Sequence, residues 1–493
     1  MSAAPAVAGR RLLPNFAVLL TAHLLSKATT LVSLFLLGRY LGDQAFGRYA
    51  VAFAIPVALE ALGDLGTSQT LIRDGAGRPD AVRRDAVGLL PAKLVLATLL
   101  VIASVIAGRL LDLPAEIAEM VLYLSLAKAL DSFTILARSV FEAFERMDYE
   151  AASLILDAVV RLALIVFALL NGFGLVGLSK AMAVSSAIVL VATVAVTVHR
   201  FVGLRHWSFD RRRTFAVLAA GLPLATVWFF EGLSFRVDTI IVGRYLGDES
   251  AGLFSAAVRL VEPLLIVPLV MAMTMLPVIS RHLLERRDTL GRLFRAGLQL
   301  ALLAAILESI VLIGLAHEIV TATFGPEFAE AGRILRIMAL ALFPLVIRVI
   351  LVNVMTALHA QRSLLVAQLA GTATNIALAL ALVQAIGANG AVVAILAGEG
   401  ITIAVAWWFV RGAVVVDLRE LVRIGAVGLT GLAVLTLSAG LGPYLATAAA
   451  LVSVVVGVRL GAVVHEEDKR YLVHAVPRFA RLTLLVLGPV RPR

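Results

Sequence analysis

The sequence contains no cysteine, and only 15% of its 493 residues are charged and 7% aromatic. The absence of cysteine excludes a disulfide framework, a thiolate nucleophile and a cysteine-ligated metal site. The scarcity of charge excludes an ordinary soluble domain and intrinsic disorder, because both present polar surface to water. The chain is instead rich in apolar residues, which make up 61% of it and give a mean hydropathy of +0.98. This composition indicates an integral membrane protein.

The apolar residues form stretches long enough to cross a membrane. A spanning helix needs about 20 mostly apolar residues, because lipid offers its backbone groups no hydrogen-bond partners. The stretches are continuous rather than alternating, which predicts helices instead of β-strands. We count fourteen, at residues 15–38, 47–70, 87–111, 117–141, 151–170, 175–199, 215–242, 251–279, 297–316, 334–358, 365–386, 390–410, 424–440 and 444–463.

Basic residues are distributed unevenly between the two ends of these predicted helices. The chain carries 43 Lys and Arg against 33 Asp and Glu, a net charge of +10. If the N-terminus is cytoplasmic, the cytoplasmic connections hold most of the loop cations, and the opposite connections hold only Arg39, Arg48, Arg109, Arg244 and Arg333. The positive-inside rule therefore places both termini in the cytoplasm. Topology explains most of the basic excess, so no nucleic-acid partner is expected.

A six-residue motif, GRYLGD, occurs twice. It stands at residues 38–43 and again at 243–248, 205 residues further on, and Gly47 and Gly252 keep the same offset. Each copy ends one apolar stretch and precedes the next, and its Gly-Asp pair is typical of a tight turn. Because the copies follow the first and the seventh stretch, they predict two six-helix halves that run in the same direction. Such halves are related by an axis along the membrane normal.

The predicted fold class is therefore an all-α integral membrane protein with about 14 transmembrane helices, arranged as two six-helix bundles plus two C-terminal helices. Two equivalent bundles form a cavity that can open to either side, which is transporter architecture. The basic tail fits either a helix lying on the inner leaflet or a solvated chain end. The expected divisions are a cytoplasmic N-terminus (1–14), an N-terminal bundle (15–200), a basic cytoplasmic linker (201–214), a C-terminal bundle (215–410), two added helices (411–463) and the tail (464–493).

Ionisable residues inside the predicted helices are candidates for function, because a charge in lipid costs several kcal/mol unless it faces a cavity or a partner. A cavity lined by basic side chains favours an anionic substrate such as a phosphate. Carboxylates that share a helix face repel each other, which raises the pKa of at least one of them. The basic candidates are Lys27, Arg161, Arg236 and Arg348, and the acidic candidates are Glu60, Asp64, Glu231 and Asp238.

Structural ion pairing is the competing explanation for other charges in these helices. Three pairs are spaced to neutralise each other along one helix: Arg138 with Glu142, Asp157 with Arg161, and Arg259 with Glu262. The sequence has no Walker loop, HExxH zinc motif or recognisable Ser-His-Asp set. It therefore predicts no enzyme, no metal site and no cofactor.

A series of short motifs extends through nearly the whole chain. They are RYLGD and GRY within residues 39–49, DLGTSQ at 64–69, LIR at 71–73, RVD at 236–238, PVISR at 277–281 and GANGA at 387–391. In their order and spacing these motifs resemble the polysaccharide-transporter family, the O-antigen flippase branch of the multidrug/oligosaccharidyl-lipid/polysaccharide exporter superfamily.

The resemblance implies a bacterial inner-membrane flippase that carries undecaprenyl-pyrophosphate-linked oligosaccharide from the cytoplasmic to the periplasmic leaflet, coupled to an ion gradient. It also implies a cationic cavity. Lys27, Arg161, Arg236 and Arg348 would then contact pyrophosphate or sugar, and Asp64 and Asp238 would serve gating or ion coupling. The partners implied are the lipid-linked oligosaccharide, the bilayer and other polysaccharide assembly proteins.

Other functions remain compatible with the sequence. A proton- or sodium-coupled multidrug antiporter has the same architecture, although a basic cavity would repel organic cations. A membrane-embedded glycosyltransferase or polymerase needs a substantial outside loop with acid/base residues, and this chain has none. A lipid scramblase or a membrane scaffold would require no particular charged residue inside the predicted helices.

Overall fold

The computed structural model describes residues 8–75, 78–203, 210–266, 268, 287–358, 360–411 and 418–460, and these residues contain helices and no strand. The chain divides into two compact units, Met1–Ser255 and Ala256–Arg493. Five predicted parts fall wholly or partly outside the described residues: the N-terminus (1–7), the linker (204–209), the eighth stretch (267 and 269–279, with the PVISR motif), the two added helices (412–417 and 461–463) and the tail (464–493). The bundle boundary at 201–214 stays a prediction.

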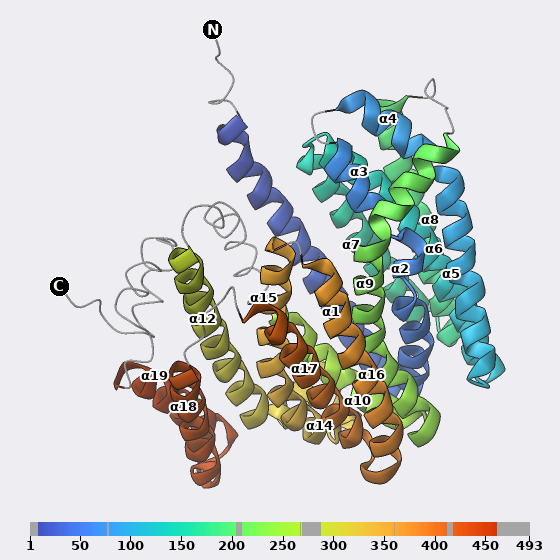
Figure 1. The fold of residues 1–493 in the computed structure, drawn as a ribbon. Helices are drawn as coiled ribbons and strands as arrows, with labels where there is room; N and C mark the ends of the chain where they lie inside the picture. The colour runs from blue at the N-terminus through green and yellow to red at the C-terminus, as the bar shows by residue number, and fades with distance from the viewer. Residues whose placement is uncertain are drawn as a thin grey trace. The chain divides into compact units, whose positions relative to one another are not determined.

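The first unit is formed by α1 to α9 and the start of α10 (Figure 1). Its helix α6 packs against α8, α5 and α1, and α1 also packs against α7 and α9. The helices are α1 (Ala8–Ala58), α2 (Ala61–Asp64), α3 (Thr67–Gly75), α4 (Pro79–Gly88), α5 (Leu90–Leu110), α6 (Ala115–Ala143), α7 (Met147–Leu170), α8 (Gly174–Thr197), the π-helical turn η1 (Val198–Val202), α9 (Arg211–Leu246) and α10 (Asp248–Val261).

The predicted fold class is confirmed for the described residues. Ten of their helices are long and apolar enough to cross a membrane, or eleven if the two parts of α9, which meet at 48° beyond Pro223, count as one span. The count of fourteen is compatible with this number but is not established by it. The first two predicted stretches lie in one helical run, since α1 continues past residue 42.

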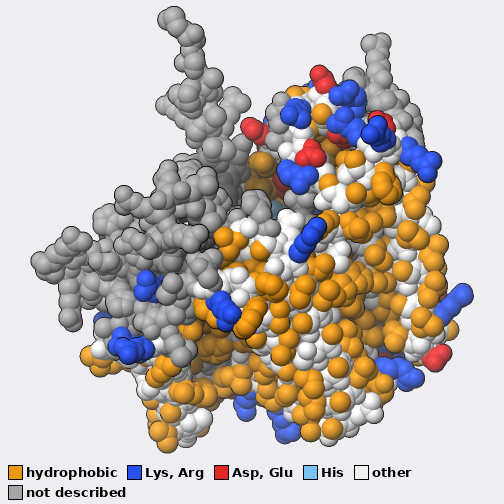
Figure 2. All heavy atoms as spheres, in the orientation of Figure 1, with side chains coloured by type: hydrophobic (Ala, Val, Ile, Leu, Met, Phe, Trp, Pro, Cys, Tyr) orange, Lys and Arg blue, Asp and Glu red, His pale blue; other side chains and the backbone are white. Residues whose placement is uncertain are grey.

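Apolar side chains cover the outside of the first unit. On α5, Leu94, Val95, Ile106 and Leu110 are each at least half exposed, an arrangement that water would penalise and lipid favours. On the face drawn in Figure 2, hydrophobic side chains cover most of the described surface, while charged ones gather at the end formed by α3 and α4. This distribution is that of a protein surrounded by a bilayer with its polar ends in water.

The two GRYLGD copies adopt the same backbone conformation and pack against each other. Gly42 (φ 74°, ψ 174°) and Gly247 (φ 88°, ψ 179°) both take a left-handed φ that glycine adopts without strain. A Cβ on Gly47 would lie 1.7 Å from the carbonyl oxygen of Asp248, and one on Gly252 would lie 2.1 Å from that of Asp43. The contact is therefore reciprocal, as an internal repeat predicts.

One ion pair joins the copies. The Arg48 guanidinium is 2.8 Å from the Asp248 carboxylate and 3.2 Å from that of Glu116, at the start of α6. All three side chains are partly exposed, so these ion pairs add little to the stability of the fold and mainly orient the two copies. The repeat therefore fixes the junction between α1, α9 and α10.

The second unit consists of the rest of α10 and the helices that follow (Figure 1). Its closest helix pair is α16 and α17, where a Cβ on Gly371 would lie 1.8 Å from Oγ1 of Thr402. The described elements are η2 (Glu262–Leu265), α12 (Arg287–Gly314), α13 (Ala316–Phe324), η3 (Pro326–Phe328), α14 (Ala331–Met338), η4 (Ala339–Ala341), α15 (Leu342–Ala357), α16 (Gln361–Ile386), α17 (Ala388–Val410), α18 (Leu418–Leu437), η5 (Ala439–Leu441) and α19 (Pro443–Leu460). The last two helices, α18 and α19, pack against α12.

Candidate functional site

A helix break in the first unit follows Asp64, the charged residue of the DLGTSQ motif. Leu65 (φ 45°) and Gly66 (φ 73°) have a positive, left-handed φ, and these two residues separate α2 from α3. The Asp64 carboxylate accepts hydrogen bonds from the hydroxyls of Thr67 (3.0 Å) and Ser68 (2.6 Å) at the start of α3. Its other oxygen accepts from the backbone N–H of Ser68 (3.4 Å) and thereby caps α3, because the first turn of a helix has backbone N–H groups without intrahelical partners.

Asp64 also forms an ion pair with Lys93 of α5. The Lys93 side chain is fully buried and donates a second hydrogen bond to the carbonyl oxygen of Gly63 (3.2 Å). Removing an ammonium group from water is costly, so this lysine depends on its carboxylate partner. The sequence placed Asp64 among the gating residues, and the structure gives it a partner that the sequence did not reveal.

Glu60, the second carboxylate of this region, lies where α1 gives way to α2. Its Oε1 is 3.1 Å from Nζ of Lys128 on α6, and Lys128 is in turn 3.9 Å from Asp131. The two predicted coupling carboxylates, Glu60 and Asp64, are therefore each matched to a different lysine.

The pairs continue from α6 to α7. Arg161 lies 2.8 Å from Asp157 and 3.5 Å from Asp131, so the predicted pairing of Asp157 with Arg161 is confirmed. Arg138 approaches Asp157 to 3.5 Å and donates to both oxygens of Ser153, at 2.9 Å and 3.0 Å. We name the set Glu60, Lys128, Asp131, Arg138, Asp157 and Arg161 the charge network.

The charge network is electrically balanced, with three cations and three carboxylates. Its members beyond Glu60 are between 13% and 21% exposed, so they are largely buried between the helices. Arg161 was predicted as an anion-binding residue of a basic cavity, yet two carboxylates already neutralise it. Arg138 was expected to pair with Glu142, and its hydrogen bonds go instead to Ser153 and Asp157.

Lys27 differs from these cations. It is exposed on α1, which packs against α7, and within the described residues no carboxylate forms an ion pair with it. His23, one turn earlier, interacts electrostatically with both Lys27 and Arg138, which places the lysine close to the charge network. An ammonium group in a membrane helix without a carboxylate partner is available to an anionic ligand.

Three further predicted residues lie on α9. Asp238 is buried, whereas Glu231 and Arg236 are half-buried. Their spacing along the helix places Glu231 and Asp238 on one face and turns Arg236 away from it.

Arg348, the fourth predicted basic residue, is on α15 in the second unit. It is 3% exposed and lies 2.9 Å from the carboxylate of Glu399 on α17, which is itself buried. The sequence did not single out Glu399, because its partner lies on another helix. The polar side chains Asn375 and Thr402 on the neighbouring helices are also buried.

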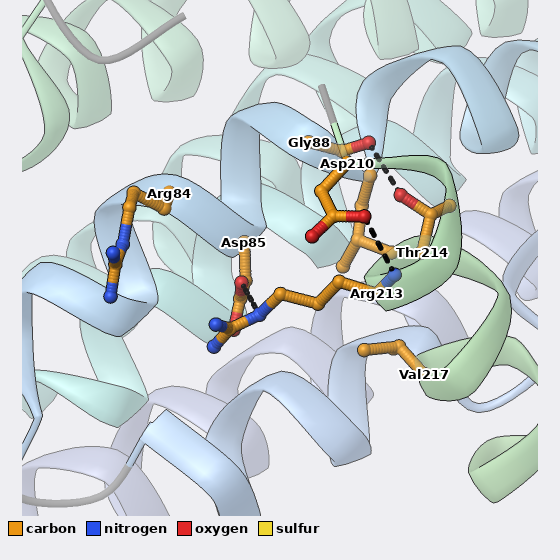
Figure 3. Close-up of a pocket in the computed structure, with 8 residues that line it drawn as sticks. Arg84, Asp85, Gly88, Asp210, Arg213, Thr214 and Val217 are labelled. Atoms are coloured by element: carbon orange, nitrogen blue, oxygen red, sulfur yellow. Dashed lines mark hydrogen bonds and ion pairs between the residues drawn. The ribbon is translucent and has the colours of Figure 1, made fainter. Parts of the chain in front are cut away.

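A pocket of about 250 Å³ opens at the end of the first unit where α9 begins (Figure 3). Asp210 caps α9 by accepting from the backbone N–H of Arg213, whose guanidinium in turn holds Asp85 of α4 at 2.5 Å. Thr214 donates to the carbonyl oxygen of Gly88 at 3.2 Å. These bonds fasten α4 to the first turn of α9.

The turn between α6 and α7 carries a further arginine, Arg146. It forms two hydrogen bonds with Asp148, at 2.9 Å and 2.7 Å. The carboxylate of Asp148 raises the pKa of Arg146 above its usual range, so this guanidinium is always charged.

The helices and their interior charges define a class: a multi-pass all-α membrane protein with the fold of known transporters. A solved structure described as "Lipid II flippase MurJ, inward closed conformation" matches with a TM-score of 0.74 and 14% identity, over 90% of this chain and 98% of that one. An inward-facing multidrug resistance MATE family transporter matches with a TM-score of 0.68 and 17% identity, over 81% and 95%. A MOP superfamily transporter from Pyrococcus furiosus matches with a TM-score of 0.57 and 18% identity, over 81% and 95%.

The family follows from the sequence profile. The profile described as "Polysaccharide biosynthesis protein" matches residues 12–283, more than half of the chain, so the protein belongs to the polysaccharide biosynthesis protein family. The profile described as "Lipid II flippase MurJ" matches residues 231–460. No curated protein sequence matches. The families and structures matched are those of transporters rather than enzymes, in agreement with the prediction that the chain is not an enzyme.

Proposed function

We propose that the protein is a flippase that moves an undecaprenyl-pyrophosphate-linked oligosaccharide across the bacterial inner membrane for the synthesis of a cell-surface polysaccharide. The observation that carries this proposal is Lys27, an exposed cation without a carboxylate partner among the described residues, beside a charge network in which every other cation is paired. Family membership and the fold shared with a MurJ flippase and MATE transporters support it.

The chemistry of the substrate explains why such a lining is needed. Hydroxyls and phosphates lose their water when they enter hydrocarbon, so a sugar headgroup cannot cross the bilayer without substitute partners. Ser153, Thr193 and the charge network offer hydrogen-bond donors and acceptors to hydroxyls. Lys27 offers a positive charge to a phosphate, while the polyprenyl chain stays in the lipid.

Transport requires more than binding. A substrate bound equally in the inward and outward states shifts no equilibrium, so some contacts must differ between the two. In the proposed cycle, Lys27, Arg161, Arg236 and Arg348 contact pyrophosphate or sugar. The carboxylates that stabilise the inward or outward state, or couple the change between them to an ion gradient, are Glu60, Asp64, Glu231 and Asp238. Both termini then lie in the cytoplasm, and the partners in the cell are the other polysaccharide assembly proteins.

Lys27 provides the direct test of this function. In proteoliposomes, the rate at which a fluorescent polyprenyl-pyrophosphate-linked oligosaccharide changes leaflet is expected to fall about 10- to 100-fold in Lys27→Ala, since a hydrogen bond to a charged group contributes about 1.5–3 kcal/mol. Lys27→Arg is expected to keep most of the rate, because it keeps the charge.

Lys180→Ala is the matched control. Lys180 is also an exposed lysine of the first unit, but it pairs with Glu119 at 3.2 Å. Its loss is expected to leave the rate unchanged. Equal rates for wild type and Lys27→Ala would remove Lys27 from the substrate path, and no leaflet exchange by the wild type would overturn the function itself.

A further inference from the structure

Two glutamates where α6 meets α7 have no role in the charge network. Glu142 is in the last turn of α6 and Glu150 in the first turn of α7. Glu150 is 6% exposed, and its Oε2 is buried without a hydrogen-bond partner. Within the described residues, neither glutamate forms an ion pair. A buried ionised carboxylate without a partner is costly, so this group must acquire a proton or a cation.

Helical spacing places the two glutamates at the same end of the α6–α7 pair. Arg138 and Glu142 are four residues apart on α6, and Glu150 and Ser153 are three apart on α7, so each pair shares a helix face. Arg138 donates to Ser153 across the two helices, at 2.9 Å. Both glutamates therefore lie one turn nearer the connecting turn, and Glu142 is close enough to repel Glu150 electrostatically.

Few other charges reach this pair. Among the described residues, the charged groups that interact with Glu150 are Glu142 and Arg138. Most polar groups on the surrounding elements have partners of their own. Asp157 pairs with Arg138 and Arg161, Arg73 with Asp74, and Arg83 with Asp80, while the hydroxyls of Thr193 and Thr197 bond to Ser153 and to the carbonyl oxygen of Thr193. The other titratable groups of these elements are His23 and Lys27 on α1 and His199 and Arg200 on η1.

We infer that Glu142 and Glu150 together bind one proton and form a proton-coupling site of the transporter, in addition to the carboxylates named above. The proton adds to one carboxylate oxygen, and the resulting O–H group can be shared with the second carboxylate, as in other paired carboxyl groups. The role of this site in coupling rests on the proposed function, whereas its binding of a proton does not rest on it.

Arg138 connects this site to the substrate region. With one proton on the pair, a single negative charge remains there, and Arg138 stays with Ser153 and Asp157, the arrangement observed. With the proton released, two negative charges one helical turn away attract Arg138, which shares a face with Glu142. Asp157 then keeps Arg161 as its only arginine partner. Proton binding by the two glutamates therefore changes the charge of the network. A change in the charge of the network changes the proton affinity of the glutamates in turn, because such coupling is reciprocal.

Infrared spectroscopy on the purified full-length protein tests proton binding without transport. The carbonyl-stretch band of a protonated carboxyl is expected in wild type near neutral pH and is expected to disappear in alkaline buffer. Glu308 of α12 also has a buried carboxylate oxygen without a hydrogen-bond partner, so Glu150→Gln should lose one component of the titrating band rather than all of it. Glu145→Gln is the matched control, because Glu145 is exposed on the adjoining turn, and it should keep the band. An unchanged band in both Glu150→Gln and Glu142→Gln would overturn the inference.

Flipping in proteoliposomes tests the coupling. Wild type is expected to flip the fluorescent polyprenyl-pyrophosphate-linked oligosaccharide faster under a proton gradient, whereas Glu150→Gln should flip it at a rate insensitive to that gradient. Acceleration by a proton gradient in Glu150→Gln, or by a sodium gradient alone in wild type, would contradict the inference. If wild type shows the infrared band but flips no substrate, the proposed function fails and the proton site stands.

Discussion

Replacing Asp64 with alanine is expected to destabilise the first unit by about 3–5 kcal/mol, the cost of leaving a buried charge without its partner. The charge is Lys93, whose side chain is fully buried against Asp64 and the carbonyl oxygen of Gly63. The same substitution removes the cap of α3, which Asp64 provides through Thr67 and Ser68. The thermal midpoint and the monodisperse yield of the purified protein should both fall sharply.

Two further variants separate the charge effect from the cap. Asp64→Asn combined with Lys93→Met removes both charges and keeps a hydrogen-bond acceptor for α3, so it is expected to recover most of the lost stability. Asp74→Ala breaks the ion pair of Asp74 with Arg73, whose side chains are 51% and 66% exposed, and should cost less than about 1 kcal/mol. A single Asp64→Ala as stable as Asp74→Ala would show that Lys93 does not depend on Asp64.

Replacing Gly47 with alanine is expected to disrupt the junction between the two GRYLGD copies, at a cost of about 3 kcal/mol or more. The added Cβ would lie 1.7 Å from the carbonyl oxygen of Asp248, and a backbone atom cannot move aside as a flexible side chain can. The reciprocal variant Gly252→Ala meets the carbonyl oxygen of Asp43 and should behave in the same way.

Gly400→Ala controls for glycine replacement within a helix. No atom lies within 4 Å of a Cβ built at this position of α17. Alanine there should be neutral or stabilising by about 0.5–1 kcal/mol, as expected for glycine in a helix interior. Thermal unfolding in detergent would compare the three variants. Equal midpoints for Gly47→Ala and Gly400→Ala would mean that the copies do not pack as closely as described.

Local features of the structure could be predicted from the sequence. Apolar runs predicted the positions of most of the described helices, although the predicted stretch 47–70 is divided among α1, α2 and α3. The GRYLGD repeat predicted two equivalent turns, now seen at Gly42 and Gly247. The pairs Asp157 with Arg161 and Arg259 with Glu262, three or four residues apart, are also observed. Each of these depends on the geometry of a single helix or turn, which the order of residues determines.

Contacts between helices could not be predicted in this way. Asp64 and Lys93 are 29 residues apart, Glu60 and Lys128 are 68 apart, and Arg138 and Asp157 are 19 apart. Their pairing depends on which helix faces pack together, and one sequence does not specify that. For the same reason the sequence did not reveal that Arg161 and Arg348 each pair with a carboxylate on another helix. Their role as cavity cations stays a prediction.

The choice of substrate is the central claim, and a comparison of two probes on the wild-type protein tests it most directly. In proteoliposomes, the protein is expected to move a fluorescent polyprenyl-pyrophosphate-linked oligosaccharide between leaflets and to leave a fluorescent organic cation where it is. Movement of the lipid-linked sugar well above that in protein-free liposomes would support the flippase. Exchange of the organic cation for protons, with the lipid-linked sugar left in place, would contradict it and favour a multidrug antiporter.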